Sequence, residues 1–188
     1  MKLNEIADIS TGLVLSRKRS LTNKEFGYKL LTLKSFNENG YIEDEFLDDF
    51  FSEENMKDQY LTKEGDIIVR LSAPNTAVYV EKGQEAIVIP SLFVIIRSSS
   101  DDILSKFLNI YLNSPMCKRQ LAGDIIGSVL SIVKTSSFKE INVPKYSKDQ
   151  QQNIINLNEL VLKEKRLLNQ LLDEKEKYHR AIMNKMFS

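Results

Sequence analysis

The last part of the chain carries a helical repeat of apolar residues. Apolar side chains recur there at alternating spacings of three and four, the repeat of a coiled-coil helix. Glu164 and Lys175 interrupt this seam with charge. Because neither Gly nor Pro follows Pro144, the pattern predicts one helix over 148–185, roughly 57 Å long at about 1.5 Å per residue. The seam consists of Ile154, Leu157, Val161, Leu168, Leu171, Tyr178 and Ile182.

A capping box marks the start of this helix. The hydroxyl of Ser147 can accept a hydrogen bond from the backbone N–H of Gln150, whose side chain can reach back to the N–H of Ser147. Asp149 adds negative charge to the first turn, where the helix dipole favours it. A helix this long cannot fold back into a domain of this size. We therefore expect a globular head over 1–146 and a projecting rod over 147–188.

The apolar stripe of the predicted rod is wider than a two-stranded seam requires. It also includes Leu160, Leu167, Leu172 and Met183. A stripe of this width suits a helix that packs against more than one neighbour. A long helix packed along its own head is the competing interpretation. It is less favoured because the head offers no second helix of matching length.

The head mixes strand and helix patterns, which predicts an α+β fold. An apolar run over 92–96 is typical of a strand buried on both faces. A broad apolar stripe over 103–112 predicts a helix. Ser114 and Pro115 then end that helix and start another, as N-cap and first helical residue. Further strands are expected at 28–33, 67–71 and 77–80, with turns at 37–40, 64–66 and 82–83.

Two segments of the head are expected to lack strands. Residues 2–9 read as a short helix or turn that leads into a basic loop over 11–24. The acidic residues between 43 and 58 read as the solvated face of a helix, because runs of like charge are usually solvated.

Composition argues against several kinds of site. A single cysteine, Cys117, and a single histidine, His179, leave little material for a zinc site, a disulfide framework or a His-based triad. The chain has no Gly-rich nucleotide loop, no apolar stretch approaching about 18 residues, and acids too early for a secretory signal. We therefore expect a non-catalytic, cytoplasmic protein with no membrane span, no metal and no cofactor of its own.

Charge is unevenly distributed although the net charge is zero. Residues 1–34 hold 7 basic and 3 acidic side chains, residues 35–66 hold 2 and 11, and residues 67–148 hold 10 and 6. A protein with this distribution can present a basic face to a polyanion while its acidic segment lies elsewhere.

Four motifs, taken in order, resemble a known family. They are the opening over 3–12, the Gly-Asp-Ile turn and strand over 63–69, the Gly-Ser step over 127–129, and the passage into the helix over 143–151. The chain thereby resembles one half of the DNA specificity subunit of type I restriction-modification systems. It departs from that family's pattern at Leu13 and Val14 in the opening loop, at Asn142 in place of a proline, and at Asp149 in place of a glutamate.

The resemblance implies a division of labour. The head would read one half of a bipartite site in double-stranded DNA, and the rod would pair with an identical rod in an antiparallel homodimer through the seam residues. Methyltransferase (M) subunits would dock on the rod and carry S-adenosylmethionine and the catalysis, and a restriction (R) subunit would cut. A second, non-identical half-subunit is the alternative partner.

The resemblance also implies DNA contacts of two kinds. Arg suits guanine, and Asn or Gln suits adenine, at base edges in the major groove. Candidates for phosphate contacts are Arg17, Lys18, Arg19, Lys24, Lys118, Arg119 and Lys134. Candidates for base edges are Arg70, Ser72, Asn75, Gln120, Ser128 and Ser131. The alternative for the whole chain is a coiled-coil adaptor or regulator without base readout, supported by the zero net charge and the acidic segment.

Overall fold

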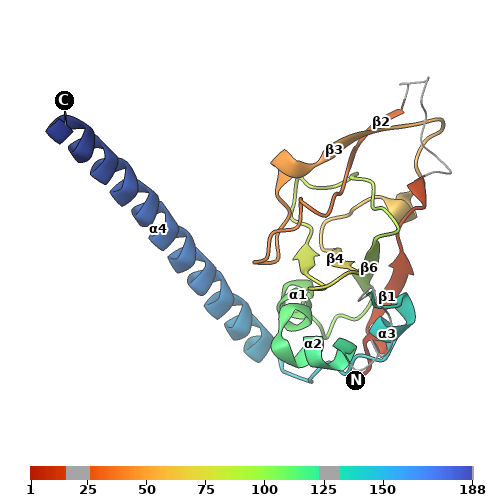
Figure 1. The fold of residues 1–188 in the computed structure, drawn as a ribbon. Coiled ribbons are helices and arrows are strands. Elements are labelled where there is room, and N and C mark those ends of the chain that lie inside the picture. The colour runs from red at the N-terminus through yellow and green to blue at the C-terminus, as the bar shows by residue number, and fades with distance from the viewer. Residues whose placement is uncertain (16–25, 123–131, 188) are drawn as a thin grey trace.

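The computed structural model describes residues 1–15, 26–122 and 132–187 and shows a head followed by one projecting helix (Figure 1). This helix, α4 (Lys148–Phe187), leaves the head beside α1 (Ser105–Asn113), and its C-terminal end lies far from the head. The predicted capping box is confirmed. The N–H of Ser147 donates to Oε1 of Gln150 over 2.9 Å, and the N–H of Gln150 donates to Oγ of Ser147 over 3.3 Å.

An antiparallel four-stranded sheet with strand order β1-β6-β4-β5 forms the centre of the head. Side chains of the inner strand β6 alternate between two cores, since Val94 and Ile96 lie in one and Phe93 and Ile95 in the other. All four are fully buried, which confirms the prediction of a strand buried on both faces for 93–96, whereas Leu92 precedes the strand and is exposed. The strands are β1 (Ala7–Thr11), β4 (Ile67–Arg70), β5 (Ala77–Tyr79) and β6 (Phe93–Ser98).

Three helices of the head and the start of α4 share the first core. They are α1, α2 (Pro115–Ala122) and α3 (Thr135–Lys139). The predicted start of α2 is confirmed, because Oγ of Ser114 accepts a hydrogen bond from the N–H of Cys117 over 3.2 Å. In the second core the rings of Phe36 and Phe93 stack at 4.5 Å between centroids. The expected α+β fold class is confirmed.

A two-stranded antiparallel sheet of β2 (Phe26–Leu30) and β3 (Asp48–Ser52) lies at the end of the head opposite α2 (Figure 1). The prediction that this acidic segment is a helix face was wrong. Burial alternates along this segment as in a strand, because Phe50 and Ser52 are buried while Asp49 is exposed and Phe51 is partly exposed. Solvation of the acids was predicted correctly. Short 3-10 turns complete this part at Leu3–Glu5, Asp44–Phe46 and Asp58–Tyr60.

The N-terminal prediction was half right. Leu3–Glu5 does form a short helical turn, but Ala7–Thr11 forms the edge strand β1, where a helix or turn up to residue 9 and a loop from residue 11 were predicted. Pairing with β6 supplies the hydrogen bonds that make this segment a strand, and the segment itself has only one buried residue, Ala7. The predicted turns are confirmed at Gly40, Gly65 and Gly83, where φ is 89°, 88° and 94°. No helix within the described residues is long and apolar enough to cross a membrane.

Candidate nucleic-acid interface

Segments distant in the sequence meet where β4 ends. Ser72 pairs with Ile132 in an antiparallel bridge, and the N–H of Val133 donates to the carbonyl of Leu71 over 2.9 Å. The N–H of Leu71 in turn donates to the carbonyl of Leu92 over 3.0 Å. We call residues 72–75 and 132–135 the candidate edge. Two predicted DNA contacts, Ser72 and Lys134, are thus brought to one surface.

The turn over 72–75 presents Ala73 and Pro74 to solvent, and Asn75 closes it with a φ of 55°. Asn75 was predicted to read bases, but its side chain is buried. Its Nδ2 donates to the carbonyls of Arg70 and Leu71 over 3.1 and 2.9 Å. Donation by Nδ2 to a base would require these bonds to break. Asn75 therefore shapes the turn.

Arg70 precedes this turn and is partly buried. Its Nε is buried and has no hydrogen-bond partner among the residues that the structure describes. Arg70 remains a candidate for contact with a DNA acceptor.

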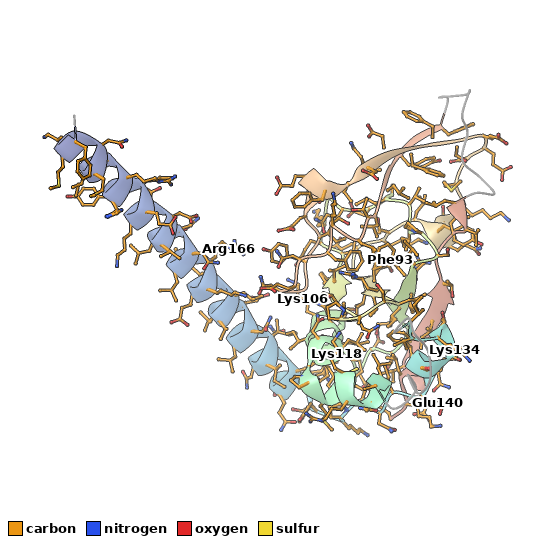
Figure 2. All side chains as sticks on the ribbon, viewed as in Figure 1. Phe93, Lys106, Lys118, Lys134, Glu140 and Arg166 are labelled. Carbon is orange, nitrogen blue, oxygen red and sulfur yellow. The ribbon has the colours of Figure 1, made fainter. Side chains whose placement is uncertain are left out.

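The basic candidates next to the edge differ in orientation. Lys134 is exposed at the N-terminus of α3, on the side of the head away from the rod (Figure 2). Lys118 points inward, because its Nζ donates to the backbone carbonyl of Asn75. Burial lowers the pKa of Lys118 to about 8. Lys118 thus ties α2 to the turn, and a phosphate contact would require it to leave this position.

Two candidates on α2 also differ. Arg119 is exposed. The amide of Gln120 is occupied by groups of the head, because its Nε2 donates to the hydroxyl of Tyr111 over 2.8 Å and its Oε1 accepts from the N–H of Asn142 over 2.8 Å. The remaining candidates, Arg17, Lys18, Arg19, Lys24, Ser128 and Ser131, lie outside the described residues.

The seam of α4 is an unpartnered apolar surface. Leu157, Leu168 and Tyr178 are 64%, 58% and 70% exposed, although each occupies a position predicted to be covered. Ile154 differs, since it packs partly against the core of the head. An exposed stripe of this size indicates an interaction site. Its other exposed members are Leu160, Val161, Leu167, Leu171, Leu172 and Ile182.

The junction between head and rod was not predicted. Gln151 is fully buried in the first turn of α4, where it makes hydrogen bonds to the loop before α1. Its neighbours in sequence are polar, so periodicity could not reveal its burial. Lys106 on α1 lies between carboxylates of the head and the rod. Within the described residues, no cluster of His, Cys, Asp and Glu could hold a metal ion.

Comparison with known proteins rests on structure. No protein-family model and no curated protein matches the sequence. The HsdS subunit from Thermoanaerobacter tengcongensis matches 97% of this chain with a TM-score of 0.72 at 16% sequence identity. This chain has the HsdS fold. The match covers 46% of that subunit, so the chain spans less than half of its length.

Two further structures share the HsdS fold. A chain from a structure on complex assembly and conformational transition of the type I R-M system matches 94% of this chain, with a TM-score of 0.66 and 15% identity, over 41% of its own length. The type I restriction-modification system S subunit from M. genitalium matches 90%, with a TM-score of 0.50 and 15% identity, over 39% of its length. The likeness thus includes both the head and the rod.

Proposed function

We propose that this chain is a sequence-specific DNA-recognition subunit of a type I restriction-modification complex. Each head would read one half of a bipartite target, and the rod would join two chains into a homodimer. The observation that carries the proposal is the exposed seam of α4 on a chain with the HsdS fold. Pairing of two seams buries the apolar stripe and supplies a second head.

Dimensions support this arrangement. The seam from Ile154 to Ile182 is about 42 Å long at about 1.5 Å per residue. At about 3.4 Å per base pair this corresponds to about 12 base pairs, close to one turn of DNA. Two heads at opposite ends of an antiparallel pair would therefore stand a little more than one helical turn of duplex apart. A two-fold dimer would require a palindromic or near-palindromic split target.

The partners follow from the same proposal. The head over 1–146 contacts DNA, and the rod over 147–188 serves both the dimer and the docking of methyltransferase subunits. The stripe is wide enough for more than one neighbour. S-adenosylmethionine and the catalytic groups belong to those subunits, and cleavage belongs to a restriction subunit. The chain itself contributes recognition and spacing without catalysis.

Selection from a random duplex library by the purified chain, alone and with its methyltransferase subunits, tests the proposal. We expect enrichment of two short motifs separated by a constant spacer. Affinity should fall steeply with salt, because Lys and Arg contacts displace counterions from phosphates. The absence of any enriched motif in both preparations would contradict the proposal.

A coiled-coil adaptor without base readout is the second candidate. The zero net charge and the exposed acids of β3 favour it, since they oppose approach of a polyanion to that part of the head. An adaptor would dimerise through α4 as well. It would show no salt-dependent binding to any duplex, and the selection experiment therefore separates the two candidates.

A further inference from the structure

The rod is anchored to the head by a buried amide. Oε1 of Gln151 accepts a hydrogen bond from the backbone N–H of Leu104 over 2.9 Å. Its Nε2 donates to the carbonyls of Asp102 and Tyr146 over 2.7 and 3.0 Å. One turn further along α4, Ile155 is buried in the first core. Gln151 and Ile155 form the anchor, in which the donors and acceptors of the amide are directed at backbone groups of the head.

Two lysines brace the rod beyond the anchor. Nζ of Lys106 lies 3.2 Å from Glu81 of the head and 3.4 Å from Glu159 of the rod. On the rod, Nζ of Lys165 lies 3.1 Å from Glu38 and 2.9 Å from Oδ1 of Asn39. Figure 2 shows Lys106 on the side of the head that faces the rod. Lys106 and Lys165 form the braces.

The anchor and the braces lie at different distances along the rod. Glu159 and Lys165 follow Gln151 by 8 and 14 residues, about 12 and 21 Å at about 1.5 Å per residue. Contacts at three heights on one helix restrict its tilt, whereas a contact at its base alone would leave a hinge. Beyond these contacts, toward its C-terminal end, the rod extends away from the head (Figure 1).

We propose that the anchor and the braces fix the angle between head and rod and thereby select the length of the spacer between the two half-targets. This inference rests on the proposed function. Gln151, Lys106 and Lys165 act as positioning residues, because they hold the reading head in place without touching DNA.

Geometry makes a small change of angle significant. A head of this size extends roughly 30 Å from its attachment to the rod. A tilt of about 10° would move its far side by about 5 Å, more than the rise of about 3.4 Å between base pairs. Both heads of a two-fold dimer tilt together, so the mismatch doubles. Discrimination against a spacer one base pair longer or shorter therefore requires the angle to be held within a few degrees.

The two kinds of contact differ in strength. The braces are ion pairs in contact with solvent, which contribute little individually. The anchor is buried, and breaking it would leave donors and acceptors of the backbone unsatisfied. We therefore assign the mean angle to the anchor and the stiffness about that angle to the braces.

The braces are tested first, since their removal leaves the core intact. In the full chain, Lys106→Met with Lys165→Met removes both charges and keeps most of the side-chain length. Lys177→Met is the matched control, because Lys177 pairs with Glu174 within the rod at 2.7 Å and does not reach the head. Selection on a library with variable spacers gives the half-site motif and the spacer distribution for each protein.

We expect the double variant to retain the half-site motif while its preference for the best spacer over one base pair more or less falls by about three- to tenfold, as removal of two weak ion pairs predicts. Lys177→Met should keep the wild-type distribution. Small-angle scattering of the dimer should show a broader range of head-to-head distances in the double variant. An unchanged spacer distribution in that variant would overturn the inference, whatever the anchor variants show.

The anchor is tested by Gln151→Met, with Gln152→Met at the neighbouring exposed position as control. We expect Gln151→Met to shift the preferred spacer without changing the half-site motif, provided that circular dichroism shows a folded chain. If it unfolds, the brace variants decide alone. If the wild-type chain selects a split target and both variants keep its spacer, only this inference fails. If the wild-type chain selects no split target, the proposed function fails.

Discussion

Arg97 on β6 holds the buried carboxylate of Asp66 through two guanidinium nitrogens. Nε lies 3.0 Å from Oδ1 and Nη2 lies 3.0 Å from Oδ2. The same Nη2 donates to the carbonyl of Leu61 over 2.8 Å. Oδ2 of Asp66 accepts a further hydrogen bond from the backbone N–H of Lys63 over 3.0 Å. This pair joins the turn before β4 to the strand beside it, so it fixes the centre of the sheet on which the candidate edge is built.

Replacement of Asp66 by Ala should lower the free energy of unfolding by about 3 kcal/mol, because it leaves the guanidinium of Arg97 mostly buried without its partner. Urea unfolding followed by circular dichroism measures the change. Asp58→Ala is the control, since Asp58 is exposed and its ion pair with Lys63 is long, with 4.0 Å between Oδ2 and Nζ. Equal losses of unfolding free energy in the two variants would contradict the stabilising role assigned to the pair of Arg97 and Asp66.

Leu168→Asp should abolish the dimer. Leu168 lies at the middle of the seam, and pairing would bury an uncompensated carboxylate there at a cost of several kcal/mol. Light scattering at micromolar concentration should give twice 21.6 kDa for the wild type and 21.6 kDa for the variant. Asn169→Asp, at an exposed position outside the seam, should keep the larger mass. A dimer that survives Leu168→Asp would place the interface elsewhere.

Arg17→Ala combined with Arg19→Ala should weaken binding to all duplexes alike and flatten the dependence of affinity on salt, by about one unit of slope for each phosphate that the variant no longer neutralises. Binding titrations over a series of salt concentrations measure both effects. Lys134→Ala at the candidate edge should act in the same direction. A change of sequence preference would instead identify these side chains as base readers.

The pH dependence of stability should carry a contribution from Lys118. Its pKa is about 8 in the folded chain, because of burial, and 10.5 is the ordinary value. Between these values the unfolded chain binds more protons, so this contribution makes stability rise with pH from about 8 to 10.5. Burial raises the pKa of Cys117 to about 11 from 9.0, which acts in the opposite direction.

Lys118→Met isolates this contribution. The difference in unfolding free energy between wild type and variant should move in favour of the wild type as pH rises across the window. Urea titrations at pH 7, 8, 9 and 10 measure it. A constant difference over this range would show that Lys118 keeps its ordinary pKa in the folded chain and is solvated there.

Local patterns predicted part of this protein without help from the fold. The rod, its capping box and its seam follow from residues a few positions apart, as do the start of α2 at Ser114 and the buried strand residues 93–96. Each depends on hydrogen bonds or side-chain periodicity within one segment, and the chain itself supplies every partner that the prediction needs.

Other features required partners from distant segments. The strand Ala7–Thr11 exists because β6 offers its hydrogen bonds, and the acidic segment forms β3 because it pairs with β2 and buries Phe50. In the sequence Asn75 and Lys118 look alike as polar surface candidates, yet each is turned inward by acceptors on the 70–75 segment.

By itself the sequence determined that a mixed head is followed by a long helix with an apolar stripe, because periodicity and helix caps are properties of neighbouring residues. Only the tertiary structure decided the angle at which that helix leaves the head. That angle depends on Gln151, whose amide is satisfied by backbone groups of Asp102 and Leu104, nearly 50 positions earlier in the chain. No pattern within a single segment encodes such a pairing, since the groups meet only when the head has folded.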